Sequence, residues 1–349
     1  MLKKLSLLTL TLIFFFAACV ASTPTGPHTL TVMTHDSFVM SETVLKEFES
    51  ANNVVVQILK SGDAGAMVNT ALLSQKAPLA DVLYGVDNTL LSRTLDEALF
   101  ERYDSLALGG IPAELKLDPS NRALPVDYGD VCLNYDIAFF VEKGLPPPSS
   151  LDDLTQPEYK GLTVIEDPAT SSPGLAFMLA TWARYGDDGF GEYWTAMRAN
   201  AVKVAADWET AYYTDFSASS GAGPRPIVVS YASSPPAEVF FADPQPTEAP
   251  TAAVTSVGSC FRQVEFVGIL SGTKNRDLAE KWVDFMLSKT FQEDMPLNMF
   301  VYPALSAATL PDVFAKHAAP VNSPVILSPQ VIAEKREALI KEWTEIVVK

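Results

Sequence analysis

Basic residues are scarce in this chain, and their scarcity excludes one large class of partner. The 349 residues include 25 Lys and Arg against 42 Asp and Glu, which gives a formal net charge of −17 at pH 7. Such a charge repels the phosphates of nucleic acid, so no nucleic-acid partner is expected, whereas a small cation is attracted.

Catalytic motifs and long apolar runs are also missing. The sequence contains no Gly-x-Ser-x-Gly, His-Glu-x-x-His or phosphate-loop pattern, so no sequence motif supports a hydrolase or nucleotide-binding function. Beyond residue 19, no apolar run approaches the length of a membrane-spanning helix. The chain that follows residue 19 is too long for one small core and suits two lobes.

The N-terminal segment has the pattern of an export signal. A basic start and an apolar run at residues 5–16 precede small residues and Cys19. The run is too short to span a membrane, and a Cys directly after Ala-Ala resembles the bacterial lipoprotein signal. We therefore expect an export signal at 1–18, a lipidated Cys19 and a tether at 19–28. An ordinary cleaved signal with a chance Cys is the alternative.

The first hundred residues alternate strand and helix patterns. Apolar runs at 30–33, 54–59 and 81–84 each precede a segment with helical character. This order predicts a mostly parallel sheet with helices on both faces, and it places functional residues in the loops after the strands. Among those loops, Asp63 lies between glycines and is expected to be the most exposed carboxylate, whereas Asp87 is expected to cap a helix.

Two long extended segments, 125–135 and 260–270, interrupt this alternation, and a second α/β set lies between them. We expect two α/β lobes joined by two extended crossover strands, which is the architecture of a hinged binding protein. The expected boundaries are residues 29–127 with 262–310 for lobe 1, 128–261 for lobe 2, and 311–349 for a C-terminal helical segment that packs on the lobes.

The stretch from Asp167 to Gly174 combines a strand end, a turn rich in hydroxyls and a helix start. Pro173 suits the first helical position, and the free N–H groups beside Ser171 and Ser172 form a polar cradle for a ligand. The same serines also suit simple helix capping, so both roles remain open at this point.

Several motifs resemble the periplasmic thiamine-binding proteins of ABC importers in order and spacing, over residues 29–349. They are Thr34–Phe38, Val86–Asn88, Pro125–Gly129, Asp167–Gly174, Asp207–Tyr212, Ser230–Pro235, Gln263–Glu265 and Tyr302–Pro303. The resemblance implies the type II periplasmic solute-binding fold, with the ligand held in the interlobe cleft. It further implies a monomeric receptor, not an enzyme, that needs no cofactor or metal, closes about a hinge and delivers its ligand to an ABC permease.

The same resemblance implies the site residues. Thiamine carries a fixed thiazolium charge and a flat aminopyrimidine, so its receptor needs aromatic faces and hydrogen-bond acceptors. The expected ligand-binding residues are Asp63, Ser171, Trp208, Tyr231, Phe300, Ser172, Tyr212 and His35. Each aromatic residue among them also suits ordinary core packing.

Three cleft positions depart from the family pattern. Phe300 stands where the best-known members have Trp, and His35 and Ala237 stand where they have Tyr. Because these changes remove polar contacts, the ligand is left open between thiamine, its phosphates and a pyrimidine precursor.

Two other functions have some support in the sequence. The pair Tyr212-Tyr213 resembles the adjacent tyrosines of ferric-ion-binding proteins of the same fold. An iron site also favours hard oxygen ligands or imidazole nearby, and only His35 among the three histidines lies in a plausible cleft loop. Thiamine-degrading enzymes also resemble this fold and use a Cys nucleophile with a Glu base, roles that fall to Cys132 and Glu265 on the two crossovers.

The cysteines after Cys19 have a competing role. Cys132 and Cys260 lie on crossovers that run side by side in a two-lobed receptor, within reach of a disulfide, and export to an oxidising compartment favours that bond. Two unconnected buried thiols are the alternative.

Overall fold

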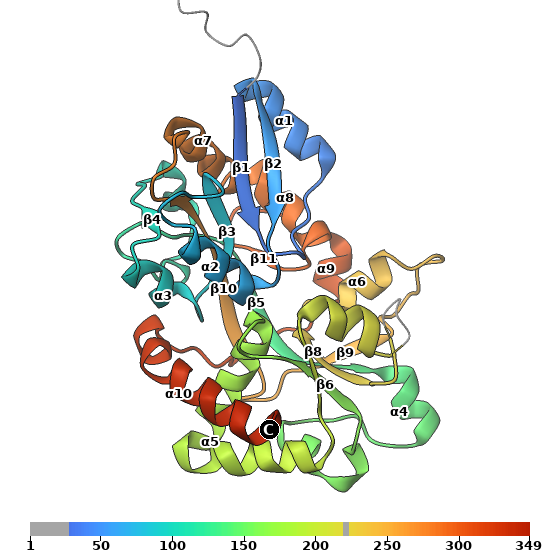
Figure 1. The fold of residues 1–349 in the computed structure, drawn as a ribbon. Coiled ribbons are helices and arrows are strands. Elements are labelled where there is room, and N and C mark those ends of the chain that lie inside the picture. Colours follow the sequence, from blue (N-terminus) through green and yellow to red (C-terminus); the bar gives the residue numbers. More distant parts are fainter. Residues whose placement is uncertain (1–27, 219–222) are drawn as a thin grey trace, which may run out of the picture.

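The computed structural model describes residues 28–218 and 223–349. The expected export signal, the lipidation site Cys19 and nearly all of the expected tether lie outside these described residues. The described chain folds into two α/β lobes that share one continuous mixed sheet with the strand order β2-β1-β3-β10-β5-β8-β6-β7 (Figure 1).

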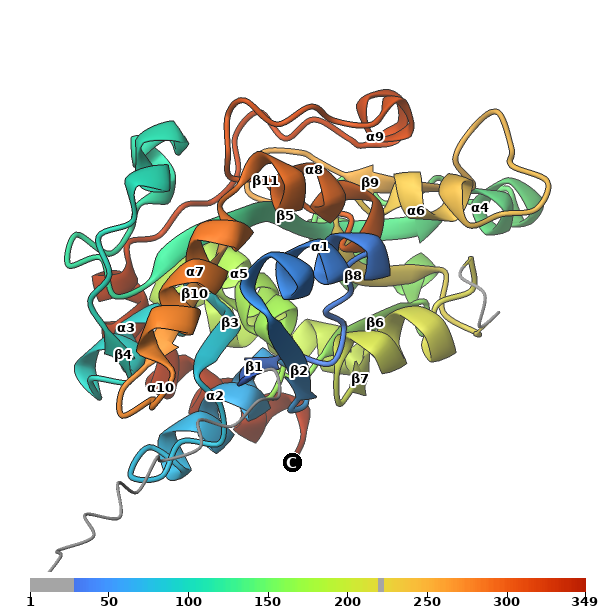
Figure 2. The same cartoon turned by 90° about the horizontal axis from the view of Figure 1, so that it is seen from above.

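The first lobe is built from the alternating segments that the sequence predicts. Strand β1 pairs in parallel with both β2 and β3, and helices α1 and α2 lie on opposite sides of these strands (Figure 2). The elements are β1 (His28–Thr34), α1 (Glu42–Asn52), β2 (Val54–Lys60), α2 (Ala64–Leu73), β3 (Val82–Asp87), α3 (Leu91–Asp96), β4 (Phe100–Glu101), η1 (Leu106–Gly110) and η2 (Ala113–Leu115). Every residue of β3 is buried, as expected for a strand covered on both faces.

Two long antiparallel strands connect the lobes, which confirms the two predicted crossovers. These strands are β5 (Leu124–Asp136) and β10 (Phe261–Leu270). Strand β10 pairs with β3 of the first lobe on one side and with β5 on the other. The second half of β5 then pairs with β8 of the second lobe, so one uninterrupted strand is hydrogen-bonded in both lobes.

The second lobe repeats the α/β pattern around β6, which is parallel to both β7 and β8. Its elements are α4 (Ile137–Lys143), η3 (Asp152–Thr155), η4 (Pro157–Tyr159), β6 (Thr163–Glu166), α5 (Ser172–Ala199), β7 (Lys203–Ala205), the π-helical turn η5 (Thr210–Asp215), β8 (Ile227–Tyr231), α6 (Pro235–Phe240) and β9 (Thr251–Val254). Helix α5 is kinked at Gly186, whose φ of 71° is non-helical.

The last part of the chain returns to both lobes. Its elements are α7 (Arg276–Met286), α8 (Lys289–Asn298), β11 (Tyr302–Pro303), α9 (Asp312–His317) and α10 (Pro329–Val347). Helix α9 contacts α6, whereas α10 packs against α5 of the second lobe and α3 of the first (Figure 1). No helix within 28–218 and 223–349 combines the length and apolar character needed to cross a membrane.

Two local predictions need correction. Pro173 takes the second helical position of α5 rather than the first. The prediction that Asp87 caps α3 is wrong, because that helix begins at Leu91, after Leu90. Asp87 instead ends β3, where its fully buried carboxylate accepts the backbone N–H groups of Thr89 at 2.9 Å and of Leu90 at 3.2 Å.

A disulfide joins Cys132 and Cys260, whose Cα atoms lie 4.4 Å apart. Cys132 lies in β5, and Cys260 immediately precedes β10. Both side chains are buried. The covalent link therefore ties together the two strands that connect the lobes, at the end of their pairing nearer the second lobe.

We expect the disulfide to be detectable by thiol counting. A protein lacking residues 1–19 retains two cysteines, and it should show no reactive thiol when unfolded without reductant but two after reduction. Reduction releases a loop with a sequence separation of 128 residues, which the chain-entropy model equates with about 4–5 kcal/mol of unfolding free energy. A Cys132→Ala/Cys260→Ala double variant is the control and should not respond to reductant. Two reactive thiols before reduction would contradict the bridge.

Candidate ligand-binding site

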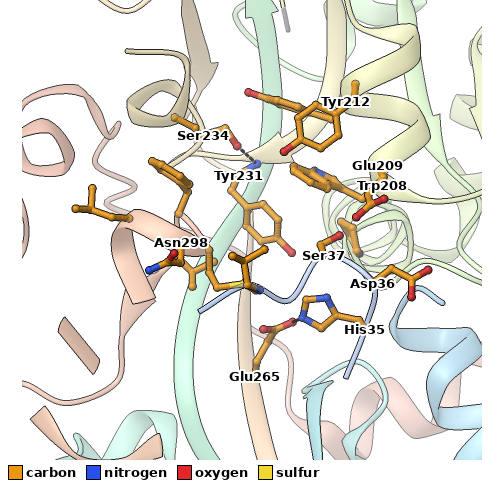
Figure 3. A pocket seen from close by; sticks show the side chains of 18 of the residues that line it. His35, Asp36, Ser37, Trp208, Glu209, Tyr212, Tyr231, Ser234, Glu265 and Asn298 are labelled. Atoms are coloured by element: carbon orange, nitrogen blue, oxygen red, sulfur yellow. Dashed lines mark hydrogen bonds and ion pairs between the residues drawn. The ribbon is translucent and has the colours of Figure 1, made fainter. Parts of the chain in front are cut away.

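A cleft of about 530 Å³ lies between the lobes, within the range of small-molecule sites. The first lobe contributes the loop after β1, the start of α2 and the segment after α8, and the second lobe contributes the first turn of α5, η5 and α6. Figure 3 shows the side chains of these elements converging, with Tyr231 between a cluster near Trp208 and a cluster near Glu265.

One wall of the cleft is aromatic. The rings of Trp208 and Tyr212 are stacked, with centroids 4.9 Å apart and an interplanar angle of 18°. The indole Nε1 of Trp208 donates to the Ser230 hydroxyl at 3.0 Å, so the orientation of the ring is fixed before any ligand arrives. Fixed ring faces of this kind suit stacking or cation–π contact with a flat or cationic ligand.

Tyr231 ends β8 and is held against the crossover strands. Its hydroxyl donates to the side-chain oxygen of Gln263 at 2.6 Å. Gly129 makes room for the ring, because a Cβ there would lie 2.7 Å from Cδ1 of Tyr231. The amide of Gln263 in turn donates to Asp87 and, at 3.0 Å, to the hydroxyl of Ser172. The ring position therefore depends on both crossovers and on the start of α5.

Asp63 connects the two lobes across the cleft. As the N-cap of α2 it accepts from the N–H of Ala64 at 2.6 Å, and its other oxygen accepts from the N–H of Trp208 at 3.2 Å. Nearby, the N–H of Gly65 donates to the carbonyl of Thr170 at 3.1 Å. The lobes are therefore in contact, and Asp63 is half-buried rather than the exposed carboxylate that the sequence suggested. Burial raises the pKa of Asp63 above its ordinary value.

The floor of the cleft carries a buried ionic pair. Nε2 of His35 lies 3.8 Å from a carboxylate oxygen of Glu265. Burial by itself lowers the pKa of His35, but the Glu265 carboxylate outweighs burial and the pKa is raised. The hydroxyl of Tyr84 bonds to Glu265 at 3.0 Å and to Asp127 at 2.6 Å. Burial, together with the charge of Glu265, raises the pKa of Asp127 well above its usual range, which favours the protonated form there.

The cleft is negatively charged overall. The basic side chains that line it are His35 and Lys60, whereas its carboxylates are Asp36, Asp63, Glu209, Glu265, Glu293 and Asp294. Since opposite charges attract most strongly in a partly desolvated site, this lining favours a cationic ligand over an anionic one.

Seven of the eight site residues predicted from the sequence line the cleft, and Ser171 does not. Ser171 is the N-cap of α5, is buried, and faces a separate cavity. Phe300 lines the cleft in a left-handed conformation with φ of 54°, and it packs against Phe241 of the other lobe with centroids 5.4 Å apart.

Further aromatic residues, which sequence reasoning missed, complete the wall: Tyr213, Phe240 and Phe241. The sequence offers one signal for the last two, since these adjacent aromatic residues lie shortly before the proline-rich segment 244–250. Phe241 is 69% exposed, which is high for a phenylalanine and fits a position at the mouth of a binding cleft.

The geometry weakens both alternative chemistries. Cys132 is bonded to Cys260 and fully buried, so it cannot act as a thiolate nucleophile in this state. The hydroxyl of Tyr212 donates to Glu238 at 2.6 Å, and its ring faces Trp208. Within the part of the chain that the structure describes, no group of three or more His, Cys, Asp or Glu is placed to hold a metal ion.

Two α/β lobes closed over a cleft and joined by paired strands define the class of hinged receptors for small solutes. Known proteins place the chain within that class. The model of the bacterial extracellular solute-binding proteins matches residues 77–322, more than half of the chain. The chain belongs to this family, and it is therefore an exported protein.

Individual relatives agree with this assignment and with the resemblance noted in the sequence. The thiamine-binding periplasmic protein of Salmonella typhimurium is 31% identical over 328 residues, which cover 91% of this chain and 93% of the relative. A solved periplasmic thiamin binding protein has a TM-score of 0.78 at 28% identity, covering 92% and 96% of the two chains. Apo ferric ion-binding protein A of Pasteurella haemolytica shares the fold, with a TM-score of 0.72 at 20% identity over 91% and 98%.

We expect Asp87, beneath the cleft, to impose a pH dependence on stability. Burial raises its pKa from 3.8 to about 6, so the folded chain binds this proton more tightly than the unfolded chain does. The contribution of Asp87 to the unfolding free energy therefore falls as pH rises from about 4 to about 7, by up to about 3 kcal/mol.

An Asp87→Asn variant isolates this contribution. The difference in unfolding free energy, variant minus wild type, should increase between pH 4 and pH 7 in urea titrations. Any loss of stability from altered hydrogen bonds is the same at each pH, so it does not affect how this difference changes with pH. A difference that stays flat with pH would show that Asp87 titrates normally.

Proposed function

We propose that this chain captures thiamine, or a close relative such as a thiamine phosphate or a pyrimidine precursor, and delivers it to an ABC permease. The observation that carries the proposal is the cleft itself. It combines fixed aromatic faces with an excess of carboxylates, the combination that a flat cation requires. The names of the most similar relatives support the same ligand class.

In this proposal each predicted residue has a role. Trp208 and Tyr231 offer ring faces to the ligand, and Asp63 supplies negative charge and an acceptor. Tyr212 supports Trp208 by stacking, and Phe300 closes the aromatic wall. His35 and Ser172 provide polar contacts at the opposite end, and Ser171 acts by starting α5.

The proposed mechanism is hinge closure. The lobes comprise residues 29–127 with 262–310 and residues 128–261, and the segment 311–349 packs on both. Because β5 and β10 enter both lobes, bending within these strands opens or closes the cleft. The contact of Asp63 with Trp208 forms only when the lobes approach each other, so it stabilises the closed state that the permease recognises.

The surroundings of the receptor follow from the N-terminal pattern. We propose that Cys19 carries a lipid that anchors a monomer to the membrane through the tether at 19–28. The role is binding rather than catalysis, since the cysteine that a thiamine-degrading enzyme would use is bonded in a disulfide. Ferric ion is the less favoured ligand, because Tyr212 is engaged with Glu238 and Trp208.

The first test of this function is mass spectrometry of whatever copurifies, followed by calorimetric titration of the stripped protein with thiamine and its phosphates. Trp208→Ala should weaken thiamine binding roughly tenfold or more, because a desolvated cation–π contact contributes about 1–2 kcal/mol. Trp208→Phe, which keeps a ring, should lose less. An unchanged affinity in a folded Trp208→Ala protein would remove Trp208 from the site, and no binding of any thiamine compound by wild type would reject the function.

A second prediction concerns charge. Asp63→Asn keeps one acceptor oxygen, which can still cap α2 at the N–H of Ala64, but it replaces the oxygen that accepts from Trp208 with an NH2 group and removes the negative charge. Affinity for thiamine should fall about tenfold at low salt, and the loss should shrink as ionic strength rises, because salt screens the missing attraction. Asp277→Asn makes the same change at an exposed site in α7 and should have no effect. If both variants bind alike at every salt concentration, Asp63 does not face the cation.

A further inference from the structure

A second cavity, of about 230 Å³, adjoins the cleft at Ser172, which lines both, and is bordered by both lobes and by α10. Gly65 of α2 and Arg93 of α3 come from the first lobe, and the turn before α5 comes from the second. Figure 1 shows why these segments meet, since α10 runs from beside α3 to α5. The backbone contact between Gly65 and Thr170 lies at the border of this cavity.

A buried arginine lines this cavity without adequate partners. Arg336 lies on the packed face of α10 with Ile332 and Leu339, and it is only 8% exposed. Its Nη2 donates to Glu337 at 2.8 Å, but Nε and Nη1 are buried and have no hydrogen-bond partner anywhere in 28–218 and 223–349. A guanidinium stays charged at any physiological pH, and leaving buried donors unpaired is unfavourable. The arrangement is therefore incomplete as it stands.

The charge around this cavity is opposite to that of the cleft. Its charged side chains are Arg93, Arg336 and Glu337, so it has a net positive lining in a chain whose formal charge is −17. The first turn of α5, with Ser171 and Ser172, also borders it, and a helix N-terminus carries a partial positive charge. The straight part of α5 before the kink at Gly186 is long enough to contribute this field.

We propose that this cavity is a binding site for a small oxyanion such as phosphate or sulfate. The anion would accept from the free guanidinium donors of Arg336, with Arg93 and the start of α5 adding favourable charge. The site is distinct from the cleft, where carboxylates predominate. The residues that line the cavity come from both lobes, so a bound anion favours the closed arrangement in which these residues meet. Anion binding is therefore coupled to closure of the lobes.

The test is calorimetric titration of the thiamine-free protein with inorganic phosphate, with ionic strength held constant by chloride. We expect saturable binding of one phosphate per chain, and similar binding of sulfate. Arg336→Gln should weaken phosphate binding at least tenfold, and Arg93→Gln should weaken it by a smaller factor. Lys341→Gln removes one positive charge from an exposed position of the same helix and should bind as wild type does.

Three results would overturn the site: no phosphate binding by wild type, equal binding by Arg336→Gln, or an equal loss in Lys341→Gln. If Arg336→Gln does not fold, Arg93→Gln on the other side of the cavity replaces it, and phosphate binding equal to that of wild type in this variant would overturn the site. The coupling between anion binding and closure of the lobes rests on the proposed function and is measured separately. Wild type should bind thiamine more tightly in the presence of phosphate, and this increase in affinity should disappear in Arg336→Gln and Arg93→Gln. Because the first titration contains no thiamine, failure of the anion site and failure of the proposed function are distinguishable.

Discussion

The pairing of β5 with β10 is the constraint on which the rest of the molecule depends. Each strand is hydrogen-bonded to the other, while β10 also pairs with β3 and β5 with β8. The two lobes therefore share one sheet and not merely a linker. Residues on these strands set the depth and chemistry of the cleft, since Glu265 forms its floor and Gly129 leaves room for the ring of Tyr231.

The same strands carry an unusual amount of buried polarity. Asp127 and Glu265 are opposite each other in the β5–β10 register, and Tyr84 hydrogen-bonds to both. Two carboxyl groups this close cannot both ionise at low cost in a buried site, so one holds a proton while His35 compensates the other. We infer that this network fixes the geometry of the cleft floor, which a purely apolar packing would leave free to shift.

Much of the fold could be predicted from the sequence, because strand and helix periods and the two long extended segments are local patterns. Most cleft residues were found through shared motifs such as Asp207–Tyr212. The remaining features depend on tertiary contacts that no local pattern encodes. The sequence predicts that Asp87 caps a helix, but its buried carboxylate accepts a hydrogen bond from Gln263. The sequence predicts that Asp63 is exposed, but it accepts a hydrogen bond from Trp208 of the other lobe. Arg336 follows the amphipathic period of α10, and only packing shows that its guanidinium lacks partners.

The position of β10 in the sheet also governs the order in which the chain acquires structure. Strands β1, β2 and β3 are complete by residue 87, yet β10, which pairs with the other edge of β3, begins at Phe261. Until those later residues are available, one edge of the buried strand β3 has no partner, and the core of the first lobe stays incomplete. Pairing across such a separation is slow because loop closure must precede it. We infer that this dependence on β10 delays compaction of the N-terminal half, which would suit export of the chain in an unfolded state.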